Sequence, residues 1–359
     1  MNFKQRKQSL IDLHHFLARF FDDGALDDRE AQKFKALDLL IKRAKQDNPW
    51  FTEEFVLESM RSWKNALTEE KVEDWLRGYH FPDHPSITLG IVSAGNIPLV
   101  GLHDLISGFI TGQQLLIKRS SKDKNLLPVF AQLLLKNDKQ QKIAFTEDRL
   151  YDFDAVIATG SNNTSRYFEY YFRSYPSLIR HNRNSVAVLS GEETAGQLEG
   201  LADDIMRYFG LGCRNVSKLF VPKGFDFDPL FKAVLKYQYL IDHHQYVSNY
   251  EYNKAVYLMS DVQLLENGLL LLKEDKHLSS PIACLNYQYY DHKDDLEQEL
   301  KSQKDNIQCI VGDQTKFNLA DVDFGDTQDP ELWNYADNIN TLDFLDSIIK
   351  NNYHEETQL

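Results

Sequence analysis

The sequence predicts an α/β protein with an open, mainly parallel sheet, a second α/β region and a helical N-terminal segment. Apolar residues recur at three- and four-residue steps over residues 1 to about 80, which is the helical period. From His84 onward, short apolar strands alternate with helical patterns of about 10 to 15 residues, which indicates βαβ units and a parallel sheet. Three of the strands end in small polar turns, the form expected at the carboxyl edge of such a sheet.

Composition limits the class of protein. The 359 residues include 40 Lys and Arg against 54 Asp and Glu, a net charge of −14, which disfavours binding to nucleic acid or an anionic membrane. No apolar run reaches the roughly 18 residues that span a bilayer, and the N-terminus lacks a signal-peptide pattern. Three cysteines without paired spacing argue against a disulfide framework or a zinc cluster. We therefore expect a reduced, cytoplasmic protein without a metal, a nucleic-acid partner or a membrane span.

The predicted elements of the first sheet follow in order. Strands are expected at residues 87–92, 115–118 and 155–158. A helical pattern opens at Pro98, and the segments NLLPVFAQLLLK and NNTSRYFEYYF follow the second and third strands as helices. The turns after these strands are Ser93 to Asn96, Lys118 to Ser121, and Thr159 to Ser161.

The second region repeats the alternation. A buried strand is expected at residues 186–189, followed by a helix that ends at Gly210. The stretch KLFVPKG reads as a strand with a turn, and PLFKAVLKYQYLI reads as a helix. Short apolar runs are strand candidates at residues 255–259, 282–286 and 307–311.

Two of the turns suggest an anion-binding edge. Gly160 and Ser161 at a helix N-terminus present N–H groups suited to a pyrophosphate. Lys118 and Arg119 supply the positive charge that a dinucleotide needs in an otherwise acidic protein. The G-x-G-x-x-G fingerprint is absent, so a standard Rossmann phosphate loop is not predicted. Each turn taken singly is also compatible with a purely structural role.

Cys213 is the strongest candidate nucleophile. It lies in FGLGCRN between a predicted helix and a predicted strand, where two glycines permit a tight backbone. Arg214 beside it would favour the thiolate, which is the reactive form. Cys284 and Cys309 lie inside apolar runs and are expected to be buried core thiols.

The ordered set AGNIP, IKRSS, ATGS and GLGC resembles the aldehyde dehydrogenase superfamily. Within it, the chain looks most like the LuxC-type acyl-CoA reductases, because FGDTQDPELWNYADNINTLDFL is similar to the end of that subfamily. The resemblance covers residues from about 85 to 345. It implies NADPH-dependent reduction of a long-chain acyl-CoA or another acyl thioester to an aldehyde, a homo-oligomer and a possible partner protein that supplies the acyl group.

The resemblance also implies a division of the chain and roles for its residues. The helical segment would cover residues 1–80, the coenzyme domain 81–185, the catalytic domain 186–333, and an oligomerisation strand returning to the first domain 334–345. Cys213 would be the nucleophile and Asn96 its partner in the oxyanion hole. Lys118 would contact the adenosine ribose, and the Thr159-Gly160-Ser161 turn would lie under the pyrophosphate. Arg119 would meet a 2′-phosphate, an inference from its charge.

Two departures bear on the reaction. Aldehyde dehydrogenases carry a general-base glutamate where this chain has residues 179–183, IRHNR, without a carboxylate, and a ribose-binding glutamate where it has HLSSP at residues 277–281. Because no base is present to activate water, the acyl-enzyme is not hydrolysed and remains available for hydride attack. This favours a reductase over an aldehyde-oxidising enzyme. His181 is the remaining candidate proton donor. A cysteine acyltransferase or thioesterase that uses no nicotinamide, and a non-catalytic scaffold, remain alternatives.

Overall fold

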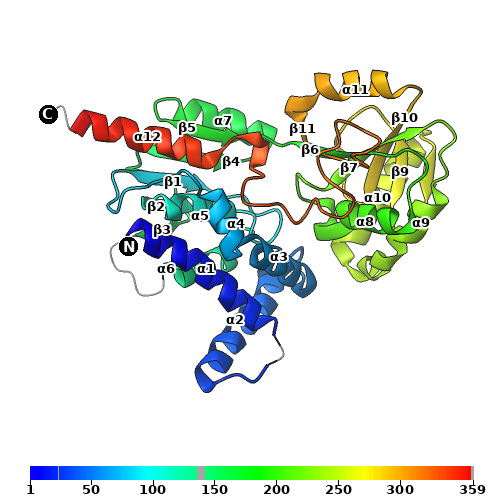
Figure 1. The fold of residues 1–359 in the computed structure, drawn as a ribbon. Helices are drawn as coiled ribbons and strands as arrows, with labels where there is room; N and C mark the ends of the chain where they lie inside the picture. Colours follow the sequence, from blue (N-terminus) through cyan, green and yellow to red (C-terminus); the bar gives the residue numbers. More distant parts are fainter. Residues whose placement is uncertain (23, 136–141, 357–359) are drawn as a thin grey trace. The chain divides into compact units, whose positions relative to one another are not determined.

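The computed structural model describes residues 1–22, 24–135 and 142–356 (Figure 1). Two compact units divide the chain: residues 1–181 together with 329–359 form unit 1, and residues 182–328 form unit 2. Each unit has its own mainly parallel sheet covered by helices, so the predicted α/β class is confirmed. Among the described residues, no helix is both long and apolar enough to cross a membrane.

The predicted helical N-terminal segment is confirmed and forms part of unit 1. Its helices are α1 (Phe3–Phe20), α2 (Asp28–Asp47), α3 (Glu53–Ala66) and α4 (Glu69–Trp75). Capping boxes at Asn2 and Asp27 begin the first two helices. Arg6 of α1 is fully buried and donates to the carbonyl oxygens of Ile110, Met1 and Pro82 at 2.7–2.9 Å. This side chain fastens the helical segment to the rest of unit 1.

The sheet of unit 1 has five parallel strands in the order β3-β2-β1-β4-β5 within the described residues. Its register pairs Val92 of β1 with Lys118 of β2 on one side and with Ala158 of β4 on the other. The carboxyl ends of these three strands therefore meet at one edge, as the sequence predicts. The elements are β1 (Thr88–Val92), α5 (Leu102–Ile110), β2 (Gln114–Lys118), α6 (Leu126–Leu135), β3 (Ile143–Thr146), β4 (Ala155–Thr159), α7 (Asn162–Phe172) and β5 (Ser177–Arg180).

The sheet of unit 2 has six strands in the order β11-β6-β7-β10-β9-β8, and only β8 runs antiparallel to its neighbour among the described pairs. The strands are β6 (Asn184–Val188), β7 (Val216–Pro222), β8 (Leu264–Glu266), β9 (Leu271–Glu274), β10 (Cys284–Tyr290) and β11 (Ile307–Val311). The α-helices are α8 (Ala195–Met206), α9 (Asp228–Val234), α10 (His244–Met259) and α11 (Lys293–Ser302). Strand β6 has β7 on one side and β11 on the other, so the chain continues from β6 to one side of the sheet and returns on its other side with β11.

Two predicted strands are wrong. Residues 255–259 form the last turns of α10, because His243 caps that helix and its buried face follows a helical period through Tyr246, Tyr250 and Asn253. Residues 334–345 are not a strand either: they contain a 3-10 turn (Ala336–Asn338) and the start of helix α12 (Thr341–Glu356). The Asn340 side chain accepts from the backbone N–H groups of Leu342 and Asp343, which starts this helix.

The return of the C-terminal segment to unit 1 is anchored by polar contacts. Arg180 forms a buried ion pair of 2.6 Å with Asp104 of α5 and donates to the hydroxyl of Thr341 over 2.9 Å. The Asp337 carboxylate accepts from the backbone N–H of His181 over 2.9 Å. Helix α12 packs on α5 (Figure 1). These contacts tie both ends of unit 1 together where the chain leaves for unit 2 and comes back.

Candidate active site

The turns that follow β1 and β2 interlock. A Cβ atom on Gly95 would lie 2.3 Å from the Ser120 hydroxyl oxygen, so only glycine fits at this point. Asp123, three residues after Ser120, accepts from the N–H groups that open α6 and from that of Leu99. Burial raises the pKa of Asp123 to about 6. The half-buried Asn96 lies in the first of these two locked turns.

Lys118 and Arg119 both turn toward the loop after β3. The Lys118 ammonium donates to the carbonyl oxygens of Glu147 and Asp148 at 2.7 and 3.0 Å. Arg119 donates to the Lys124 carbonyl and pairs with the Glu147 carboxylate, with Nη2 and Oε1 2.6 Å apart. Glu147 was not among the predicted site residues, although its position directly after a short strand of the same edge is the signal that places it beside these cations. Glu147 brings negative charge to the place where a 2′-phosphate was expected.

The third turn begins helix α7. The Ser161 hydroxyl accepts from the N–H of Thr164 over 3.4 Å and so caps the helix. A Cβ atom on Gly160 would lie 2.9–3.0 Å from Phe168 and Thr164, so glycine allows β4 and α7 to pack closely. Thr159 is the last residue of β4 and is half-buried. A helix N-terminus thus opens at the same sheet edge as the two cations.

A hollow of about 530 Å³ lies beside β2 and β3 in unit 1. Its lining residues are Leu116, Thr146, Asp148, Arg149 and Tyr151. Lys118 does not line the hollow, but its ammonium donates to the carbonyl oxygen of Asp148, which does. Its size falls in the range of small-molecule sites, about 300–1,000 Å³.

Cys213 of unit 2 lies on a short loop between a 3-10 turn (Arg207–Gly210) and β7. The cysteine is half-buried, and its carbonyl oxygen accepts from the Ser185 hydroxyl over 3.0 Å. Tyr208 and Phe209 have left-handed backbone angles, with φ of 53° and 58°, which are uncommon for such residues. The loop therefore departs from the helix by a strained path that its surroundings must hold in place.

Asn215 holds this loop. Its Oδ1 atom accepts from the N–H of Gly212 over 2.8 Å, and its amide donates to the carbonyl oxygens of Asp204 and Arg207 over 3.0 and 2.9 Å. The side chain is 2% exposed, so these bonds form away from water. Asn215 thereby ties the glycine before Cys213 to the C-terminal end of α8. In the sequence, Asn215 is only the last residue of FGLGCRN, and nothing in that motif indicates its bonds to the end of α8.

The other two cysteines are buried, as predicted, at 6% exposure for Cys284 and 2% for Cys309. Burial raises the pKa of Cys284 to about 12 and that of Cys309 to about 11. The guanidinium of Arg214 contacts the sulfur of Cys309 over 3.2 Å. The positive charge that was expected to act on Cys213 is thus also directed at a second thiol.

Residues 70–229 match the family model of acyl-CoA reductases of the LuxC type. The predicted resemblance to LuxC-type acyl-CoA reductases is confirmed over this stretch, which contains Asn96, Lys118 and Cys213. No match was found among the curated proteins.

Solved structures with the same fold are aldehyde dehydrogenases. One, from Physcomitrella patens in complex with the reaction product succinate, is 13% identical at a TM-score of 0.61, with 88% of this chain and 75% of that one covered. An indole-3-acetaldehyde dehydrogenase of P. syringae, with NAD⁺ and IAA, is 13% identical at a TM-score of 0.60, with 88% and 74% covered. An aldehyde dehydrogenase of Pseudomonas syringae with NAD⁺ and octanal is 12% identical at 0.60, with 88% and 74% covered. The aldehyde dehydrogenase-like fold is therefore confirmed.

The two segments that depart from the aldehyde dehydrogenase pattern are both fastened within their units. In unit 1, the His181 ring lies 3.6 Å from the Glu169 carboxylate of α7, so this histidine has an acidic neighbour that the local sequence IRHNR does not contain. In unit 2, the Asn286 amide donates to the carbonyl oxygens of His277 and Ser279, both over 3.0 Å. Asn286 thus holds the HLSSP segment against β10.

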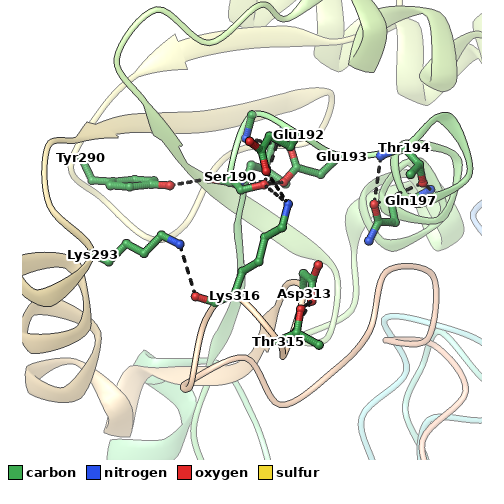
Figure 2. A network of polar contacts seen from close by, with 12 residues as sticks. Ser190, Glu192, Glu193, Thr194, Gln197, Tyr290, Lys293, Asp313, Thr315 and Lys316 are labelled. Atoms are coloured by element: carbon green, nitrogen blue, oxygen red, sulfur yellow. Dashed lines mark hydrogen bonds and ion pairs between the residues drawn. The ribbon is translucent and has the colours of Figure 1, made fainter.

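A polar cluster lies on the loops that follow β6 and β11 (Figure 2). Cys213 belongs to the opposite edge of this sheet, because it precedes β7, which runs parallel to β6. Lys316 donates to the Ser190 hydroxyl and pairs with Glu192 at 3.0 Å. The Glu193 carboxylate accepts from the N–H and hydroxyl of Ser190 at 2.6 and 2.7 Å. These groups satisfy one another, so the cluster joins two loops. No set of three or more His, Cys, Asp or Glu side chains suited to a metal ion occurs among the described residues.

Proposed function

We propose that this protein is an acyl-CoA reductase that reduces a long-chain acyl-CoA, or another acyl thioester, to an aldehyde with NADPH. The family match and the fold support an aldehyde-related oxidoreductase. The observation that carries the finer proposal is the half-buried Cys213 on a loop that Asn215 clamps, within the stretch that matches acyl-CoA reductases. A homo-oligomer and a partner that supplies the acyl group belong to the proposal as well.

The carboxyl edge of the unit 1 sheet fits a nicotinamide dinucleotide. Two cations, a capped helix N-terminus and a hollow of about 530 Å³ occur together there. Lys118 would hold the adenosine ribose, Arg119 a 2′-phosphate, and the turn of Thr159, Gly160 and Ser161 the pyrophosphate. The solved structures with bound NAD⁺ support a nicotinamide cofactor. When bound, the reduced cofactor supplies a hydride to the acyl carbon.

The chain's own residues carry the covalent steps. The Cys213 thiolate attacks the thioester carbonyl and forms a C–S bond, and the CoA thiolate leaves and takes up a proton. We assign the oxyanion to the Asn96 amide and the Cys213 N–H, and loss of one such donor typically costs about 3 kcal/mol of transition-state stabilisation. Reduction of the acyl carbon leaves a thiohemiacetal alkoxide at Cys213, whose oxygen re-forms the C=O bond as the C–S bond breaks. Aldehyde leaves, and the Cys213 thiolate is restored.

The missing carboxylate in residues 179–183 fits a reductase. A base at that place would activate water and hydrolyse the acyl-enzyme to an acid. Because IRHNR has no such group, the acyl chain stays on Cys213 until it is reduced. His181, which lies beside Glu169, is the candidate that returns a proton.

The test compares Cys213→Ala with Cys284→Ala, the same change at a buried thiol. With a series of acyl-CoAs and NADPH, we expect aldehyde from the wild type and from Cys284→Ala, and neither aldehyde nor acyl-CoA-dependent NADPH consumption from Cys213→Ala. Survival of that consumption in Cys213→Ala would overturn the proposal. A thioesterase or acyltransferase would instead consume acyl-CoA without altering NADPH fluorescence or absorbance.

A further inference from the structure

A groove in unit 1 is lined by residues of α2 and α6 and has no part in the proposed reaction. Figure 1 labels the two helices. It holds about 740 Å³, within the range of small-molecule sites of about 300–1,000 Å³. Phe16, Leu40 and Leu133 line it, pack against the hydrophobic core and remain partly exposed. At the rim, Leu39 is 59% exposed. The groove therefore offers an apolar floor that no described part of the chain covers fully.

The rim of the groove is basic. Lys33, Lys42 and Arg43 of α2 line it, and no carboxylate does among the described residues. Lys42 pairs with Asp38 at 2.7 Å. Lys33 and Arg43 form no ion pair with any residue that the structure describes. In a chain of net charge −14, two cations without a counter-charge beside an apolar floor are complementary to a ligand with a negative head and an apolar body.

We propose that this groove binds the anion of a long-chain fatty acid. The hydrocarbon chain lies along the floor of Leu40 and Leu133, and the carboxylate lies at one end of the groove. Lys33 and Arg43 are ten residues, about 15 Å, apart along α2, so the carboxylate accepts charge-assisted hydrogen bonds from the one cation at its end and is attracted by the other over a longer distance. A cation would be repelled by the rim, and a strongly polar ligand would leave the floor uncovered. The choice of a fatty acid rests on the proposed function, because the acid carries the same chain as the acyl thioester. The groove itself does not depend on Cys213.

Calorimetric titration with myristate, below the concentration at which it aggregates, tests the site. We expect saturable binding to the wild type and about tenfold or greater weakening in the double variant Lys33→Ala/Arg43→Ala. The matched control is Lys35→Ala/Lys45→Ala, which removes the same charge from exposed positions of the same helix that do not line the groove. Leu40→Glu, which places a negative charge on the floor, should abolish binding.

Three outcomes overturn the site. Equal affinity of the wild type and the Lys33/Arg43 variant excludes the two cations as ligands of the carboxylate. Equal affinity for myristate and for myristyl alcohol shows that the head is not recognised. Cosedimentation with phosphatidylglycerol vesicles that depends on Lys33 and Arg43, without saturable myristate binding, would assign this face to a lipid surface instead.

Cys213→Ala separates this proposal from the proposed function. Myristate binding that persists in Cys213→Ala, together with unchanged acyl-CoA reduction in Lys33→Ala/Arg43→Ala, places the ligand in the groove. Loss of myristate binding in Cys213→Ala places it at the cysteine and overturns the groove site. Absence of reductase activity in the wild type, with myristate binding dependent on Lys33 and Arg43, overturns the proposed function and leaves the groove standing.

Discussion

Arg214 donates a hydrogen bond from Nη1 to the sulfur of Cys309, 3.2 Å away, although its neighbour in the chain is Cys213. The contact joins the loop before β7 to strand β11, two strands away in the unit 2 sheet. Arg214 lowers the pKa of Cys309 and burial raises it, and burial prevails, so that pKa stands at about 11. Of the three cysteines, Cys213 alone is half-buried rather than buried.

The first prediction concerns these three thiols. Because the thiolate is the nucleophile, the raised pKa values of Cys284 and Cys309 make both unreactive near neutral pH. We expect iodoacetamide at pH 7.5 to modify Cys213 at least about tenfold faster than either of them. Mass spectrometry of the peptides over time measures the three rates, and Cys213→Ser should lack the fast phase. Faster modification of Cys309 would contradict the assignment of Cys213 as the accessible thiol.

The second prediction concerns the clamp on the Cys213 loop. Asn215→Ala leaves the Gly212 N–H and two carbonyl oxygens without their partner in a buried place. We expect it to lower the free energy of unfolding by about 2–4 kcal/mol, from three lost hydrogen bonds that each contribute about 0.5–1.5 kcal/mol. Urea unfolding measures the loss, and the rate of Cys213 alkylation reports on the loop.

The control for the clamp is Asn306→Ala, the same change at an exposed asparagine. It should unfold like the wild type and keep the wild-type alkylation rate. If Asn215→Ala changed stability while leaving the alkylation rate of Cys213 untouched, Asn215 would support unit 2 without positioning the cysteine.

Much of the fold could be predicted because the spacing of apolar residues and the small residues at turns indicate its helices and strands locally. The strands that end in Lys118 and Thr159 follow short apolar runs closed by small residues, and the structure places them where those runs lie. The predicted strand at residues 255–259 is wrong because its β-branched and aromatic residues are locally typical of a strand. The helix that contains them begins much earlier, at the cap residue His243. The predicted strand at residues 334–345 is wrong for a similar reason, because the Asn340 side chain starts a helix within a segment that was expected to be extended.

The chemistry of the candidate site depends on contacts between distant parts of the chain. Glu147 reaches Arg119 across 28 positions, and Arg214 reaches Cys309 across 95. The aromatic residues of α7 show a similar limit: Phe168 and Phe172 pack inward, while Tyr167 and Tyr171 are exposed. The local sequence shows which residue types are present. Which side chains contact one another, and which face of a helix is buried, follows only from the fold.

The third prediction concerns coenzyme preference and rests on the proposed function. Glu147 competes with a 2′-phosphate for Arg119 and also repels it. We expect Glu147→Gln to lower the KM for NADPH relative to NADH by about tenfold, the scale of one charge-assisted hydrogen bond. Arg119→Gln should shift the ratio the other way. Glu70→Gln, an equal change of charge at an exposed position of α4, serves as the control. If both site variants kept the wild-type ratio of the KM values for NADPH and NADH, Glu147 and Arg119 would have no part in coenzyme recognition.

The last prediction is a pH dependence set by Asp204, which is fully buried and accepts from Gly325 and Thr327. Burial raises its pKa from an ordinary value near 3.8 to about 6, so the folded protein binds this proton more tightly than the unfolded chain does. Stability due to this group is therefore highest at acidic pH and falls as pH rises from about 4 to 6. Relative to Asp204→Asn, the wild type should lose about 2 kcal/mol of unfolding free energy over that range.

Urea unfolding of both proteins from pH 4 to 7 measures the difference, in which the titration of other groups cancels. Asp294→Asn, at an exposed carboxylate, should show a constant offset from the wild type, whereas a constant offset for Asp204→Asn would mean that Asp204 titrates normally in the folded protein.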